Sequence, residues 1–103
     1  MSNKKIRYED ALASNATDKR IDILRRLGEL GSISEAARSA GVSYKAAWQA
    51  IETLTNLAGS VLVEKVVGGA GGGGARLTEM GERLLRASDL LTTARHQVIS
   101  GLY

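Results

Sequence analysis

Four side chains suited to reading nucleic-acid bases lie close together in the middle of the chain. They share a helical spacing that places them on one face of a helix, and they are Tyr44, Lys45, Trp48 and Gln49. Aromatic rings can contact thymine methyl groups and sugars, an ammonium can bind guanine or phosphate, and a glutamine amide offers adenine a donor and an acceptor. Ser43, just before them, can touch a phosphate at the helix N-terminus. This face predicts contact with base edges in the major groove of duplex DNA.

Each of these residues also has a simpler interpretation. Tyr44 and Trp48 could pack on the N-terminal arm or on a neighbouring helix, and Lys45 and Gln49 could form an ordinary solvated face. Ser43 is most simply explained as a helix cap. The combined face is therefore better evidence than any one of its members.

A glycine-rich segment, residues 68–74, holds half of the chain's glycines. It does not fit a nucleotide-binding phosphate loop, which needs a Lys-Ser or Lys-Thr pair where this chain has Ala75 and Arg76. The bare amides of such a loop, as at Gly71 and Gly72, can approach nucleic-acid phosphates closely. Charge at its base would come from Lys65 and Arg76. A flexible linker between domains is the alternative interpretation.

The candidate DNA-reading residues are placed by a succession of three predicted helices, over residues 17–30, 33–40 and 43–58. Thr17 or Asp18 is the expected cap of the first helix, and Ser32 that of the second. The expected end signals are glycines, which adopt the left-handed cap conformation without steric cost: Gly31, Gly41 and Gly59. A short alanine-faced helix, a glycine turn and a longer helix form a helix-turn-helix signature. The residues expected on the inward side of the third helix are Ala46, Ala47, Ala50, Ile51, Leu54 and Ala58.

The residues that follow predict a β-wing. The β-branched segment 61–67 indicates a strand, and residues 75–77 can return as a second strand after the glycine loop. The predicted fold class is therefore mainly α with a small β-wing: a winged helix-turn-helix over residues 17–78. Residues 1–16 are expected to form an arm that is ordered only where it docks.

A long C-terminal helix is predicted from residue 79 to about residue 99, with Thr78 as its cap. Its apolar residues step by four and three, as in a heptad seam, and they are Met80, Leu84, Ala87, Leu91, Ala94 and Val98. Such a helix is about 30 Å long, too long for the preceding domain to cover. We therefore expect residues 79–103 to pair with a second copy of the chain, giving a homodimer.

Composition excludes several other classes of function. The 103 residues carry a net charge of +3 and include no cysteine, which removes disulfides and thiolate chemistry and fits a reducing, cytoplasmic setting. The sequence shows neither a secretory signal nor an apolar run that could span a membrane. His96 is the only histidine and has no acidic or cysteine cluster around it, so we expect no metal site, no cofactor and no enzymatic activity.

Two stretches of the chain resemble ModE-type molybdate-responsive regulators of bacteria. The helix-turn-helix resemblance lies in residues 31–37 and 41–48, and the wing resemblance in residues 62–64, 68–75 and 77–78. More loosely, the chain is similar to LysR-type DNA-binding domains, whose long helix also dimerises. The resemblance implies a winged helix-turn-helix that binds a roughly palindromic operator near molybdenum uptake or cofactor genes. It also places Tyr44, Lys45, Trp48 and Gln49 at matching recognition-helix positions.

The chain departs from the ModE pattern in two respects. Ala70 stands where a relative has a basic residue, which would weaken contact between the wing and phosphate. Full ModE-type regulators continue into small β-barrel domains that bind molybdate or tungstate, whereas this sequence ends at Tyr103. We therefore expect neither oxyanion to bind this chain through the family's usual pocket.

Two hypotheses follow from the sequence. The first is a dimeric, sequence-specific binder of double-stranded DNA that regulates transcription. The second is a protein-interaction module without DNA binding, which docks a partner regulator or forms mixed dimers and uses Tyr44 and Trp48 as an apolar contact patch.

Overall fold

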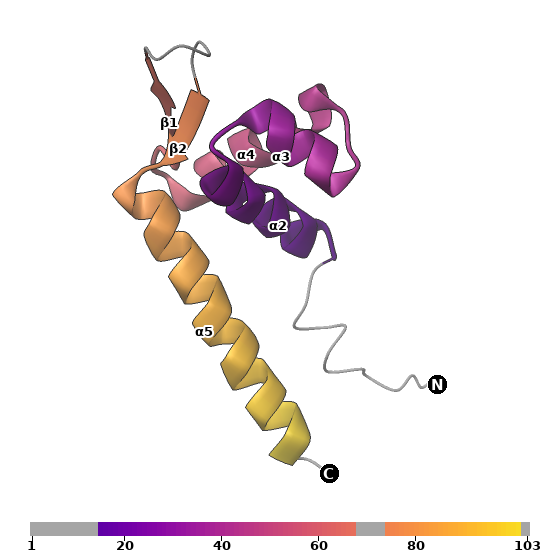
Figure 1. Cartoon of the computed structure of the whole chain (residues 1–103). Coiled ribbons are helices and arrows are strands. Elements are labelled where there is room, and N and C mark those ends of the chain that lie inside the picture. Colours follow the sequence, from indigo (N-terminus) through magenta and orange to yellow (C-terminus); the bar gives the residue numbers. More distant parts are fainter. Residues whose placement is uncertain (1–14, 68–73, 102–103) are drawn as a thin grey trace.

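The computed structural model describes residues 15–67 and 74–101. Within these ranges the elements are α2 (Asn15–Leu30), α3 (Ile33–Ala40), α4 (Tyr44–Ala58), β1 (Val63–Val66), β2 (Gly74–Leu77) and α5 (Glu79–Gly101). Figure 1 shows α2, α3 and α4 packed together, with the hairpin of β1 and β2 beside them and α5 extending away from the other elements. The predicted fold class, mainly helical with a small β-wing, is confirmed.

The three helices α2, α3 and α4 approach closely because small side chains occupy their contact faces. Ala36 and Ala37 of α3 and Ala47 of α4 are buried, and helices that meet through alanine can pack at short distances. Leu27 of α2 is fully buried in the same cluster. The other buried members of this cluster are Ile23, Ala50, Ile51 and Ala75. This core fixes which face of α4 points inward.

The helix ends are set by the predicted local signals. Gly41 follows α3 with a φ of 73°, a left-handed conformation that glycine adopts without steric cost. Ser43 Oγ accepts a hydrogen bond from the Ala46 amide at 3.0 Å and so caps α4. Ser32 Oγ caps α3 by accepting from the Glu35 amide at 3.2 Å. Both predicted serine caps are confirmed.

The predicted start of the first helix is wrong by two residues. Helix α2 begins at Asn15, so Thr17 and Asp18 lie inside its first turn and not before it. The apolar pattern could not locate this boundary because the first bulky apolar residue of α2 is Ile21. Residues 1–14, the greater part of the predicted arm, lie outside the described residues.

Two predictions about the inward face of α4 are also wrong, because Ala46 and Ala58 are exposed. The buried stripe of α4 consists of Ala47, Ala50, Ile51 and Leu54, a narrow band at i, i+3, i+4 and i+7. Ala46 lies at the edge of this band, and Ala58 lies one turn beyond its last buried residue.

The wing is an antiparallel hairpin in which Val63 pairs with Leu77 and Val66 pairs with Gly74. The first strand is shorter than the predicted 61–67, because the chain at Leu62 enters the core, where that side chain is fully buried. The second strand begins one residue earlier than predicted.

Backbone contacts attach the hairpin to the helices. The Ala75 amide donates to the Gly31 carbonyl oxygen at 2.9 Å. A Cβ at Gly74 would lie 2.7 Å from that same oxygen, closer than two such atoms can approach. Glycine at this position therefore lets β2 lie directly against the turn between α2 and α3.

Thr78 joins the hairpin to α5. Its amide donates to the Leu62 carbonyl at 2.9 Å, and its hydroxyl donates to the Val61 carbonyl at 2.7 Å. The same hydroxyl accepts from the Gly81 amide at 3.1 Å, which caps α5 as predicted.

The beginning of α5 packs on a second apolar cluster. Leu84 and Leu85 contact this cluster, whose buried members are Ile21, Leu24, Leu54 and Leu62. Gly81 is buried at the crossing, where an added Cβ would lie 2.4 Å from the Leu62 carbonyl oxygen. With 23 residues, α5 is about 35 Å long. Among the helices in 15–67 and 74–101, none has the length and apolar character that crossing a membrane requires.

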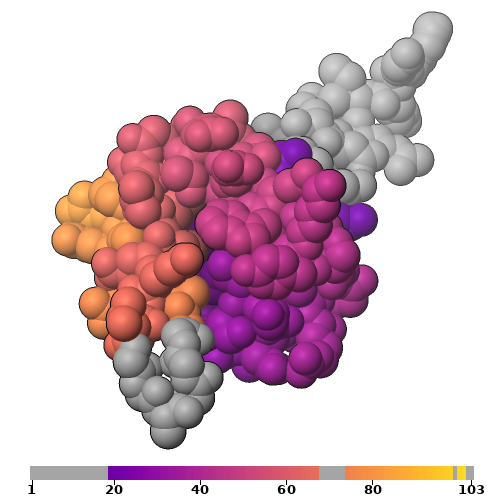
Figure 2. Space-filling model, turned by 90° about the horizontal axis from the view of Figure 1, so that it is seen from above, coloured from indigo at the N-terminus to yellow at the C-terminus, as the bar shows by residue number. Residues whose placement is uncertain are grey.

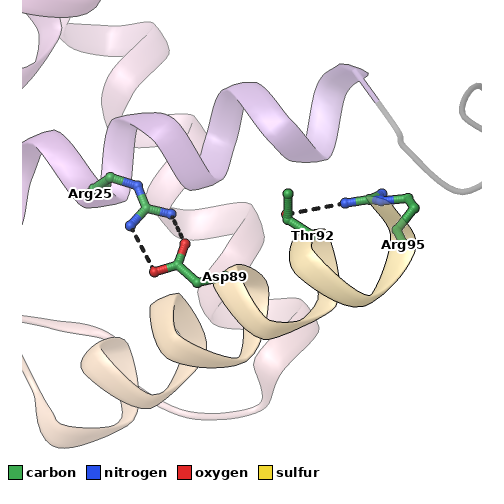
Figure 3. Close-up of polar contacts among 4 residues, drawn as sticks. All are labelled: Arg25, Asp89, Thr92 and Arg95. Carbon is green, nitrogen blue, oxygen red and sulfur yellow. Dashed lines mark hydrogen bonds and ion pairs between the residues drawn. The ribbon is translucent and has the colours of Figure 1, made fainter. Parts of the chain in front are cut away.

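An ion pair adds a polar link between α2 and α5. Arg25 donates from two guanidinium nitrogens to the two carboxylate oxygens of Asp89, at 2.8 and 3.4 Å. Figure 3 shows this pair and, further along α5, the hydrogen bond from Arg95 to Thr92 Oγ1 at 3.2 Å. The two helices are therefore joined by both apolar and charged contacts.

Candidate nucleic-acid interface

The polar and aromatic face of α4 is open to solvent. Tyr44 is 51% exposed and Trp48 is 41% exposed, and Ser43, Lys45 and Gln49 are exposed as well. This follows from the helical repeat, because the buried stripe of alanine, isoleucine and leucine occupies the opposite side of α4. The simpler expectation that Tyr44 and Trp48 are buried against a neighbouring helix does not hold among the described residues. Packing of the two on the N-terminal arm concerns residues 1–14, which lie outside the described residues.

A groove of about 740 Å³ separates this face from the wing. Trp48 and Tyr44 line one side, Val63 and Lys65 line the other, and Ser34 at the start of α3 lies at its edge. Figure 2 shows this side of the molecule, with α3 and α4 beside β1 and a hollow between them. The sequence predicted the two sides separately, and the fold places them next to each other.

The two basic residues of the wing differ in their surroundings. Arg76 lies opposite Glu64 in the sheet, and its Nε donates to the Glu64 carboxylate at 2.8 Å. Lys65 lies opposite the uncharged Ala75 and lines the groove beside α4. Side chains alternate between the faces of a strand, so Lys65 and Arg76 point to opposite faces of the hairpin. Lys65 is therefore the better placed of the two for a ligand that also touches α4.

Arg20 is a candidate contact residue that sequence reasoning missed. It comes from α2, yet it lines a shallow hollow with Gln49 and Thr53 of α4. In the sequence, Arg20 is one of several charged residues in the predicted helix over 17–30. Its position beside Gln49 depends on how α2 and α4 cross, which no local signal encodes.

The predicted wing-tip contacts, Gly71 and Gly72, and the departure at Ala70 lie outside the described residues. The other predicted DNA-contact residues are all described, and the fold divides them between the exposed face of α4 and the base of the wing. Their contact with DNA remains a prediction.

The predicted dimer seam lies on a different face of α5 from the one that packs on its own chain. Gly81 is buried, and Leu85 and Ser88 are half-buried. At 100° per residue, the seam is about a quarter turn away from these residues. The seam residues that are exposed are Met80, Ala87, Leu91, Ala94 and Val98. Leu84 differs, because it is half-buried against the second apolar cluster of its own chain.

A short helix, a tight turn, an exposed second helix and a β-wing together define a winged helix-turn-helix regulator. Residues 19–82 match the family described as "Bacterial regulatory helix-turn-helix protein, lysR family". The chain belongs to this family.

Individual relatives agree with the family match. The transcriptional regulator ModE of Yersinia pestis is 46% identical over 87 residues, which cover 84% of this chain and 33% of that protein. The DNA-binding transcriptional dual regulator ModE of Escherichia coli (strain K12) is 44% identical over 87 residues, with the same coverage. The resemblance to ModE-type regulators is therefore confirmed, and the chain spans about a third of the length of these relatives.

The fold also agrees with solved structures. The structure of Vibrio fischeri DarR in complex with DNA superposes with a TM-score of 0.64 at 20% identity, over 87% of this chain and 28% of that chain. The match to the lysR family and the ModE relatives do not favour a protein-interaction module without DNA binding.

Proposed function

We propose that the chain is a sequence-specific DNA-binding regulator of transcription that acts as a homodimer on a roughly palindromic operator. The observation that carries this proposal is the exposed face of α4, with Tyr44, Lys45, Trp48 and Gln49, beside a wing in a protein of the lysR family. Helix α4 enters the major groove, and the wing touches the backbone or the minor groove.

The side chains of α4 have different roles in DNA recognition. Gln49 and Trp48 read base edges and thymine methyl groups, and Lys45 binds guanine or phosphate. Ser43, at the N-terminus of α4, and Lys65, across the groove, contact phosphates and fix the position of the protein on the duplex. Arg20 adds a further charge beside Gln49.

The homodimer forms through the exposed seam of α5. A two-fold dimer places its two α4 helices on half-sites about 34 Å apart, or a multiple of that distance. The operators lie next to genes of molybdenum uptake or molybdenum cofactor synthesis, as the similarity to ModE-type regulators suggests. The protein acts in the cytoplasm, and we assign none of its residues to molybdate or tungstate.

DNA selection tests this proposal. The purified chain is used to select duplexes from a random pool, and binding of the selected duplex and of a random duplex is measured by fluorescence anisotropy. Gln49→Ala and Trp48→Ala are expected to lose about 1–3 kcal/mol of discrimination between the two duplexes. Gln97→Ala, which removes an exposed glutamine from α5, is the matched control and should behave like the parent chain.

The salt dependence and the selected sequence complete the test. Affinity should fall steeply with salt because phosphate contacts release counterions, and the selected sequence should occur in molybdenum-related promoters. If both α4 variants bind selected and random DNA like the parent chain, the assigned recognition face is wrong. Selected sequences absent from those promoters would contradict the assignment of the regulated genes.

A further inference from the structure

Hydrogen bonds of Thr78 fix the start of α5 to the rest of the described protein, here called the reading head, which comprises α2, α3, α4 and the hairpin. Two further contacts lie along the helix. The first contact is apolar and involves Gly81, Leu84 and Leu85. The second is the ion pair between Arg25 of α2 and Asp89 of α5 (Figure 3). It lies about 12 Å further along the helix than Gly81. Two separated contacts are enough to define the direction of a rod.

Beyond Asp89, most of α5 is exposed. Residues 90–94 and 96–98 are exposed and Arg95 is half-buried, so the direction of this half of the helix depends strongly on the contacts that precede it. Apolar contacts are non-directional and allow α5 to tilt about Leu84 and Leu85. A two-bond pair between a planar guanidinium and a carboxylate has a preferred geometry, and Arg25–Asp89 forms such a pair at 2.8 and 3.4 Å.

We propose that the Arg25–Asp89 ion pair sets the angle between α5 and the reading head, and thereby selects the half-site spacing that the dimer accepts on DNA. This inference rests on the proposed function, because it requires two reading heads joined through α5. Arg25 and Asp89 are positioning residues in this scheme, acting through the placement of α4.

A small tilt of α5 displaces its far end by several ångströms. About 20 Å of α5 lies beyond Asp89, so a tilt of about 10° displaces its end by about 3.5 Å. Successive base pairs are about 3.4 Å apart along the duplex. A tilt of this size therefore displaces α5 by a distance comparable to one base-pair step, enough to weaken the discrimination between neighbouring half-site spacings.

Operators of different spacing test this role. Binding is measured to palindromes with the parent spacing and with one base pair removed or added. Arg25→Gln is expected to reduce the preference for the parent spacing by about two- to fivefold, the effect expected from an exposed ion pair. Arg25→Asp combined with Asp89→Arg rebuilds the pair in reverse and should restore the preference.

The matched control is Arg83→Gln, which removes the same charge from an exposed ion pair inside α5, between Arg83 and Glu79 at 3.8 Å. It should keep the spacing preference of the parent chain. If Arg25→Gln instead weakens binding to all spacings equally, Arg25 acts as a phosphate contact and the proposal is overturned. An unchanged spacing preference in Arg25→Gln also overturns it.

A second measurement does not depend on DNA. The sequence has no cysteine, so Leu57→Cys and Gln97→Cys introduce two unique spin-label sites, one on the reading head and one on α5. Pulsed electron spin resonance then gives the distribution of their separation, with excess unlabelled chain present to suppress distances between protomers. Arg25→Gln should broaden this distribution, whereas Arg83→Gln and the charge-reversed pair should leave it narrow.

The two measurements separate the possible failures. An unchanged distance distribution in Arg25→Gln overturns the role of the ion pair, even if the chain binds DNA as proposed. A broadened distribution in a chain that selects no palindromic duplex overturns the proposed function, and the spacing role with it.

Discussion

Gly81→Ala is expected to destabilise the protein, although replacing glycine by alanine inside a helix usually stabilises it. Inside a helix, alanine is favoured over glycine by about 1 kcal/mol. At Gly81, however, the added Cβ would lie 2.4 Å from the carbonyl oxygen of Leu62, with the Cβ of Leu77 3.3 Å away. The same oxygen accepts the Thr78 amide at 2.9 Å, so it cannot move without straining that hydrogen bond.

The magnitude follows from these opposing terms. Overfilling a packed site costs about 1–3 kcal/mol, and the upper end applies because the nearest atom belongs to the backbone. After subtraction of the helix-propensity gain of about 1 kcal/mol, we expect Gly81→Ala to lower the free energy of unfolding by about 2 kcal/mol. For a domain of this size, that corresponds to a decrease in Tm of about 10 °C.

Thermal and urea unfolding followed by circular dichroism measure this change, with the protein concentration fixed because oligomerisation affects Tm. Gly101→Ala is the matched control in the same helix, where no atom lies within 4 Å of the added Cβ. It should be neutral or stabilising by a few tenths of a kcal/mol. A Gly81→Ala protein as stable as the parent chain would show that α5 and the residues before β1 do not cross as closely as described.

Three further predictions concern the seam, the cap and the wing. Leu91→Asp places a charge in the exposed seam, so light scattering should show that this variant is a monomer. The control Leu57→Asp, at a 72% exposed site on α4, should leave the protein dimeric. A dimeric Leu91→Asp protein would refute the seam. Ser43→Ala should lower the free energy of unfolding by about 1 kcal/mol in urea titrations, because it removes the cap of α4; unchanged stability would contradict this role. Lys65→Gln should reduce the slope of log affinity against log salt concentration by about one. Arg76→Gln should reduce this slope less, because Arg76 is already paired with Glu64. Equal slopes for the two variants would show that both cations contact phosphate.

The local features of the fold could be predicted from the sequence because local chemistry determines them. A serine three residues before a free amide caps a helix, and a glycine ends one, whatever packs around them. This is why the boundaries of α3 and α4 and the cap at Thr78 agree with prediction. The exposed face of α4 followed from helical periodicity for the same reason.

The contacts that depend on how helices and strands cross could not be predicted from the sequence pattern. Leu84 fits the heptad spacing of the seam, but α5 crosses its own core at that point and half-buries the side chain. Arg25 and Asp89 are 64 positions apart, and Arg20 lies beside Gln49 through a crossing of two helices. No residue spacing predicts such contacts, because the angle between two helices depends on the packing of the whole core.

The position of Thr78 has a consequence for how the protein opens. One hydroxyl group both closes the base of the hairpin and caps the helix that follows, so a displacement of Thr78 disturbs the hydrogen bonds of both elements. In hydrogen-exchange terms, the amides of the wing and those of the first turns of α5 should belong to one cooperative unit, with similar opening free energies. Bending at the wing would then be transmitted to the long helix as a change in protection.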